Sequence, residues 1–150
     1  MAWILNSTAA QICQALGYHR ASSMENDSPK LRESKFRVFL AVYCLNKALS
    51  LRLGRASVIQ DYDTSFPSDM WDLIAEGQWR NVVPLWLKLA VIQGKVYELL
   101  YSPGALCRPE SERVAHAENL ASEMKLEVIE PFEVRCVYFR KFVIRKELTA

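Results

Sequence analysis

Two pairs of residues in this sequence have types and spacings that could support acid–base chemistry. His19 and Arg20 are adjacent, a combination that can move a proton or bind an anion, and Asp61 and Asp63 are spaced like paired carboxylates. No nucleophile lies near the first pair in the sequence, and no third acidic ligand or glycine-containing calcium loop lies near the second. We therefore expect His19 and Arg20 to meet exposed carbonyls at a helix end, and the aspartates to be solvated or to cap a loop. The alternative, an enzyme, requires all four groups to converge on one pocket.

The cysteines and the remaining histidine do not form a metal-binding pattern. The four cysteines are far apart in the sequence, and no two of them form a CxxC motif. They are Cys13, Cys44, Cys107 and Cys136. Structural zinc sites usually take two ligands from one short segment, and Cys13 with His19 has no matching second pair. His116 stands alone in an amphipathic segment. We expect free thiols and no metal or cofactor in this chain. Because GxGxxG, GxxxxGKS/T, GxSxG and HExxH are also absent, no motif supports an enzyme.

The end of the chain is basic and aromatic, whereas the rest is nearly neutral. Residues 132–150 hold five basic and two acidic side chains (net +3), and the other 131 residues hold 14 basic and 15 acidic (net −1). From Arg135 to Lys146, cations alternate with aromatic rings, a pattern that can bind single-stranded nucleic acid. Five cations supply few phosphate contacts, so we prefer a strand or helix with a solvated basic face. The β-branched and aromatic residues beyond Pro131 favour an extended or β-like tail.

The rest of the chain has the hydrophobic spacing of helices. This spacing predicts helices over residues 3–16, 31–53, 68–77, 82–101 and 109–124. Gly17 and Gly54 are placed to end the first two helices, and residues 55–68 predict an extended linker. The helix over residues 31–53 is apolar around most of its circumference, so we expect it at the centre of the assembly. The predicted fold is all-α, an irregular multi-helix bundle or array.

The two later helices each have a predicted buried face. For residues 82–101, with Pro84 in the first turn, that face is Leu85, Trp86, Leu89, Ile92, Val96 and Leu100. For the last helix it is Val114, Ala117, Leu120, Ala121 and Met124. The longest apolar run, residues 82–92, contains Pro84 and Lys88 and is too short to cross a bilayer, so we do not expect a membrane protein.

Two blocks of the sequence resemble one known family. Residues 16–20 read LGYHR and residues 31–63 read LRESKFRVFLAVYCLNKALSLRLGRASVIQDYD. This arrangement resembles the middle regulatory region of fungal zinc-cluster transcription factors, in which LGxHR precedes a helix that ends in LSxxLGRPxxIxDxDxxxP. The later run LAVIQGKVYELLYSPGAL (residues 89–106), followed by SERVAHAENLASEMKLE (residues 111–127), is similar to later helices of the same region. Leu40, Asn46 and Ala56 replace the tryptophan, aspartate and proline usual in that family.

The resemblance transfers a set of motif positions to this chain. These positions are Leu16, Gly17, His19, Arg20, Arg37, Phe39, Tyr43, Leu49, Ser50, Leu53, Gly54 and Arg55. We expect all of them to be architectural, with Arg37 and Arg55 forming salt bridges or caps.

The resemblance also implies a function. It implies an all-α regulatory module of a nuclear transcription factor that contacts DNA through a separate six-cysteine zinc cluster. That cluster is absent from these 150 residues, so DNA and zinc are expected only in a missing region. We interpret residues 1–127 as a partial regulatory domain and residues 128–150 as a divergent basic-aromatic tail.

The expected partner of the module is a protein or small-molecule effector. A truncated helical module exposes apolar surface, which predicts self-association. The alternative interpretation is a stand-alone helical interaction or small-molecule-binding protein derived from the module.

Overall fold

The structure, a computed structural model, describes residues 1–67 and 79–133. Within these residues the chain forms α-helices joined by short 3-10 and π-helical turns, without a named strand, which confirms the all-α prediction. The predicted helix over residues 68–77 and most of the basic-aromatic tail lie outside the described residues. None of the described helices is both long enough and apolar enough to span a membrane.

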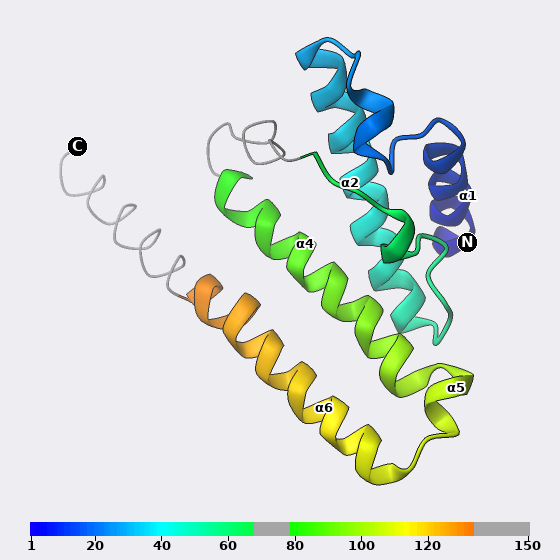
Figure 1. Cartoon of the computed structure of the whole chain (residues 1–150), viewed down its shortest axis with the longest axis vertical. Coiled ribbons are helices and arrows are strands. Elements are labelled where there is room, and N and C mark those ends of the chain that lie inside the picture. The colour runs from blue at the N-terminus through cyan, green and yellow to red at the C-terminus, as the bar shows by residue number, and fades with distance from the viewer. Residues whose placement is uncertain (68–78, 134–150) are drawn as a thin grey trace, which may run out of the picture.

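The helices form an array in which each long helix packs against the next one. Their bounds are Ala2–Ala15 for α1, Pro29–Arg52 for α2, Trp79–Val96 for α4, Pro103–Leu106 for the short α5 and Glu110–Met124 for α6. α2 lies between α1 and α4, and α6 packs on α4 (Figure 1). The central position predicted for residues 31–53 is therefore confirmed. A 24-residue helix with apolar residues on two sides needs cover from both neighbours.

Glycines end α1 and α2 in the same way, as the sequence predicted. Gly17 and Gly54 have φ of +75° and +62°. After α1, the Tyr18 N–H donates to the Cys13 carbonyl (2.9 Å), and after α2 the Arg55 N–H donates to the Ser50 carbonyl (2.9 Å). These six-to-one hydrogen bonds define Schellman caps, in which a left-handed glycine reverses the chain at little cost. Helix α2 itself begins at a Ser28 side-chain cap.

Helix α4 differs from its prediction in its start and in its buried face. It begins at Trp79, three residues earlier than predicted, so Pro84 lies in its second turn. Leu85 and Ile92 are buried as predicted, but Trp86 is 49% exposed. The side that joins the main core consists of Val83, Leu87 and Ala90. The prediction assigned one buried face to a helix that has neighbours on two sides.

Helix α6 turns much of its predicted inner face outward. Leu120 is buried, but Val114, Ala117 and Ala121 are exposed, so that part of the prediction is wrong. Among the described long helices α6 packs on α4 alone, which covers one side of it, and two lysines of α4 pair with acidic residues of the α6 segment. Lys95 Nζ is 2.6 Å from Glu123 Oε1, and Lys88 forms an ion pair with Glu127. These pairs hold the polar edge of α6 toward α4.

The helical path continues into the start of the predicted extended tail. A π-helical turn, Lys125–Ile129, follows α6, and residues 130–133 are again helical. The prediction of an extended conformation beyond Pro131 is therefore wrong for residues 132 and 133, and the rest of that stretch lies outside the described residues. Adding residues to an existing helix requires no new nucleus, which outweighs the strand preference of Val128, Ile129 and Phe132.

The main core is built on aromatic side chains of α2. Phe36, Phe39 and Tyr43 surround Phe66, with ring centroids 5.8–6.2 Å from that of Phe66. Ala10 and Cys13 of α1 close the core on one side. Phe66 belongs to the segment after α2, which has no regular helix beyond the 3-10 turn Asp61–Asp63, as predicted for the linker. Burying Phe66 fixes this segment against α2 and positions the polar groups described next.

Candidate functional site

One polar cluster joins the middle of α2 to the segment that follows it. Lys47 Nζ lies 2.8 Å from Asp61 Oδ1, and the Tyr43 hydroxyl donates to the same oxygen at 2.7 Å. Lys47 is 3% exposed, whereas the Asp61 side chain is 44% exposed. Burial, together with the hydrogen bond to Asp61, raises the pKa of Tyr43, so this phenol remains a hydrogen-bond donor. The cluster neutralises a buried cation.

A second polar cluster joins the loop after α1 to the same segment. Arg20 Nη2 is 2.6 Å from Asp63 Oδ1, and His19 Nε2 is 3.5 Å from Asp63 Oδ2. The hydrogen bond from Arg20 holds the pKa of Asp63 below its usual range, helped by the charges of Arg20 and His19 against partial desolvation. The Ser65 N–H donates to the His19 carbonyl at 2.9 Å. The two segments are thus joined by backbone and side chains.

These contacts correct the expectations for both residue pairs. His19 and Arg20 pair with Asp63 rather than with helix-end carbonyls, and each aspartate has an ion-pair partner instead of being only solvated. The enzyme alternative required His19, Arg20, Asp61 and Asp63 to share a pocket. His19, Arg20 and Asp63 line neither of the two cavities described below. The four residues therefore do not share a pocket. His19, Arg20 and Asp63 form one cluster, and Asp61 belongs to another.

Asn46, one of the departures from the family pattern, is fully buried and forms several hydrogen bonds. Its Oδ1 accepts from the Ser57 hydroxyl (2.7 Å) and the Val58 N–H (2.9 Å). Its Nδ2 donates to Asn6 Oδ1 at 3.0 Å, which connects α1 to α2. A buried amide that satisfies donors from an irregular segment replaces the hydrogen bonds that secondary structure would otherwise provide.

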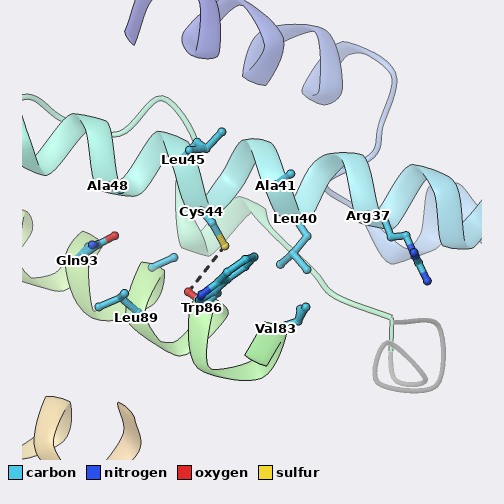
Figure 2. A pocket seen from close by; sticks show the side chains of 11 residues that line it. Arg37, Leu40, Ala41, Cys44, Leu45, Ala48, Val83, Trp86, Leu89 and Gln93 are labelled. Atoms are coloured by element: carbon cyan, nitrogen blue, oxygen red, sulfur yellow. Dashed lines mark hydrogen bonds between the residues drawn. The ribbon is translucent and has the colours of Figure 1, made fainter. Parts of the chain in front are cut away.

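An apolar hollow of about 560 Å³ lies between α2 and α4 (Figure 2). It is lined by Arg37, Leu40, Ala41, Cys44, Leu45, Ala48, Val83, Trp86, Leu89, Ala90 and Gln93. The Cys44 thiol donates to the Trp86 carbonyl at 3.8 Å, and burial raises the pKa of this thiol to about 12. Arg37 and Gln93 lie at opposite ends of the row of lining side chains (Figure 2).

A second, smaller cavity of about 360 Å³ is lined by both polar and apolar side chains. It lies beside the Lys47–Asp61 pair and reaches Gln93 and the π-helical turn Tyr97–Tyr101 that follows α4. The Lys47–Asp61 ion pair therefore forms part of the wall of this cavity. The buried member, Lys47, is already neutralised by Asp61.

The other family-motif residues are placed mostly in α2 and its cap. Arg37 Nη2 is 2.6 Å from Glu33 Oε1, one turn earlier on the same helix. Arg55 lies over the Trp3 ring, 4.8 Å from its centroid, and the Ser50 hydroxyl accepts from Trp3 Nε1 at 3.3 Å. Leu16 and Leu53 are more than half exposed, and Leu49 is half-buried. In the described residues, no group of three His, Cys, Asp or Glu side chains is arranged to hold a metal ion.

Comparison with known proteins assigns the family. The model of the fungal specific transcription factor domain matches residues 1–129. The chain belongs to this family. The negative regulator of pleiotropic drug resistance STB5 from Candida glabrata is 30% identical over 106 residues, which cover 69% of this chain and 10% of that protein. Protein STB5 from Saccharomyces cerevisiae is 25% identical over 149 residues, 96% of this chain and 19% of that protein.

A third relative has a similar extent of match. An ABC-transporter-regulating transcription factor from Aspergillus oryzae is 26% identical over 132 residues, 82% of this chain and 15% of that protein. The chain thus spans between a tenth and a fifth of these three relatives. No solved structure gives a significant match.

Sequence reasoning missed two features of this family member. The sequence analysis did not single out Lys47, which the structure buries, and it did not predict the hollow between α2 and α4. The signal for the hollow was present in the row of small residues Ala41, Cys44 and Ala48, spaced by three and four along α2.

Proposed function

We propose that this chain is the regulatory module of a fungal zinc-cluster transcription factor, acting in the nucleus on transcription from DNA. The match of the family model to residues 1–129 carries the proposal. The names of the relatives support it, because they describe transcription factors and a regulator of drug resistance. The module would transmit a signal, received from a protein or a small molecule, to a DNA-binding part of the same polypeptide.

In this proposal DNA and zinc are contacted outside the chain described here. The three described cysteines are free and lie in different places, with Cys13 buried, Cys44 half-buried and Cys107 exposed. They do not have the short paired spacing that zinc ligands need. A six-cysteine cluster elsewhere in the native polypeptide would hold two zinc ions and read DNA, and no step of the module's own action passes through it.

A full-length read of the native transcript tests whether the module belongs to a DNA-binding factor. We expect the reading frame to continue into a six-cysteine cluster with zinc-cluster spacing. A transcript whose reading frame lacks such a cluster would contradict the assignment to a DNA-binding factor and would favour the stand-alone module.

Deletion of residues 1–129 from that full-length protein tests whether the module has a regulatory role. We expect the deletion to change the output of a reporter gene while binding of the purified protein to its DNA site is retained. A deletion that leaves reporter output unchanged would argue that the module has no regulatory role.

A further inference from the structure

The hollow between α2 and α4 has the size and lining of a ligand site. Its volume of about 560 Å³ falls within the roughly 300–1,000 Å³ typical of small-molecule pockets, which are mostly apolar with a few polar groups. Its lining includes the small side chains of Ala41, Cys44 and Ala48 on α2 and of Ala90 on α4, which leave space between the two helices. Leu45 and Trp86 are half exposed at its rim. Nothing in the described residues fills the space between them.

The polar groups of the hollow lie at its two ends. Arg37 and Gln93 occupy opposite ends, and the lining between them is almost entirely apolar (Figure 2). From Arg37 to Ala48 the lining follows three turns of α2, a length of roughly 16 Å. The guanidinium of Arg37 contacts Glu33 through Nη2, and the group has five N–H donors in total. An acceptor on a ligand can therefore bind Arg37 without displacing Glu33.

We propose that this hollow binds an elongated, largely apolar small molecule that carries an anionic or strongly accepting group at its Arg37 end. The apolar body lies on the floor of small side chains, with a ring or chain against Trp86. Binding of this kind is a property of the chain alone, whereas its consequence for transcription rests on the function proposed above. In that case the ligand ties α2 to α4 and changes the packing of the array.

Two fluorescent probes with one chemical difference test this site. 8-Anilinonaphthalene-1-sulfonate has an apolar aromatic body and an anionic group, and N-phenyl-1-naphthylamine has the same body without the sulfonate. We expect each probe to bind the folded 150-residue chain at one saturable site, followed by fluorescence titration. Absence of saturable binding of either probe would overturn the proposal.

Variants that fill the hollow locate the site. Ala41→Leu and Ala48→Leu each replace a methyl group in its lining by an isobutyl group, and leucine preserves helix propensity. We expect each to weaken both probes by at least about tenfold, because the added atoms occupy the ligand's space. Ala117→Leu on the exposed face of α6 is the matched control, which should leave the affinities unchanged. Because Ala41 is exposed, Ala41→Leu remains informative if Ala48→Leu fails to fold.

Arg37→Gln tests the polar end. We expect it to weaken the sulfonate probe by roughly three- to tenfold and to leave the neutral probe unchanged, since a partly exposed charge contact is screened by water. Arg52→Gln, an exposed arginine in the last turn of the same helix, controls for the loss of charge. Equal losses for both probes would show that Arg37 acts on the fold and would overturn its assigned role.

Sedimentation of the same variants distinguishes a protein occupant. If the chain forms a dimer that Ala41→Leu dissociates, a second copy occupies the hollow and the small-molecule proposal is wrong. These measurements involve no DNA or reporter gene. A negative result in them would therefore contradict the ligand site without contradicting the proposed regulatory function. A negative reporter result would likewise leave the ligand site untouched.

Discussion

Lys47 Nζ lies 2.8 Å from Asp61 Oδ1, so the C-terminal half of α2 is tied to the segment that follows it by a cation buried in the protein. The same oxygen accepts from the Tyr43 hydroxyl, and the ammonium lies 5.3 Å from the centroid of the Tyr43 ring. Without Asp61, the ammonium would lose its anion while remaining under the segment. Asp61 is therefore expected to stabilise the fold by neutralising the buried Lys47.

Asp61→Ala is therefore expected to lower the free energy of unfolding by about 2 kcal/mol. Removing one partner of a fully buried ion pair costs roughly 3–5 kcal/mol, and the half-exposed position of Asp61 reduces this figure. Glu33→Ala is the matched control, because Glu33 and Arg37 form a more exposed pair on α2 that is expected to contribute about 0.5 kcal/mol or less. Urea unfolding of the two variants measures the difference. Equal losses would show that Lys47 finds water or another partner.

We expect the same substitution to lower the stability of the chain by different amounts at the two capping glycines. Gly17 and Gly54 both have left-handed φ, so alanine at either position is strained by about 1 kcal/mol. A Cβ at Gly17 would also lie 2.7 Å from Ser23 Oγ, whereas a Cβ at Gly54 meets no atom within 4 Å. We expect Gly17→Ala to destabilise the chain by about 2 kcal/mol and Gly54→Ala by about 1 kcal/mol. Thermal melts rank the two, and a larger loss for Gly54→Ala would contradict the structure.

Local signals in the sequence predicted much of the fold, because helices and their ends depend on nearby residues. The apolar period of α2 and the glycines after α1 and α2 gave correct helices and correct ends. The orientation of α6 was not predictable in this way, since its apolar spacing does not reveal that Lys88 and Lys95 of α4 attract its acidic edge. The extension of helix through residues 128–133 likewise depends on the helix that precedes it.

The candidate site was harder to predict because it depends on long-range pairing. His19 and Asp63 are far apart in the sequence, and nothing near either of them predicts the contact that they make. Residue types alone favoured two isolated pairs. The structure instead assigns one aspartate to His19 and Arg20 and the other to Lys47, which only the path of the segment after α2 determines.

Asp63 predicts a specific dependence of stability on pH. Because Arg20 lowers its pKa in the folded state, the ionised carboxylate stabilises the fold above the ordinary carboxyl pKa of about 3.9. This stabilisation is lost as the pH falls through the lowered value. Asp63→Asn removes the titration, so the gap in melting temperature between the parent chain and Asp63→Asn should narrow between pH 7 and pH 2.5. Parallel curves over this range would mean that the Arg20–Asp63 pair contributes no pH-dependent stability.

Cys44 and Cys107 are predicted to differ widely in their reaction with iodoacetamide. Burial raises the pKa of the Cys44 thiol to about 12, so only about one molecule in 10,000 carries the reactive thiolate at pH 8. The Cys107 thiol is exposed and therefore accessible to the reagent. We expect Cys107 to be alkylated at least about 100-fold faster, as measured by site-resolved mass spectrometry. In concentrated urea the two rates should converge, because the difference arises from burial in the hollow between α2 and α4. Rapid alkylation of Cys44 in the folded chain would show that burial does not hold its thiol in the protonated form.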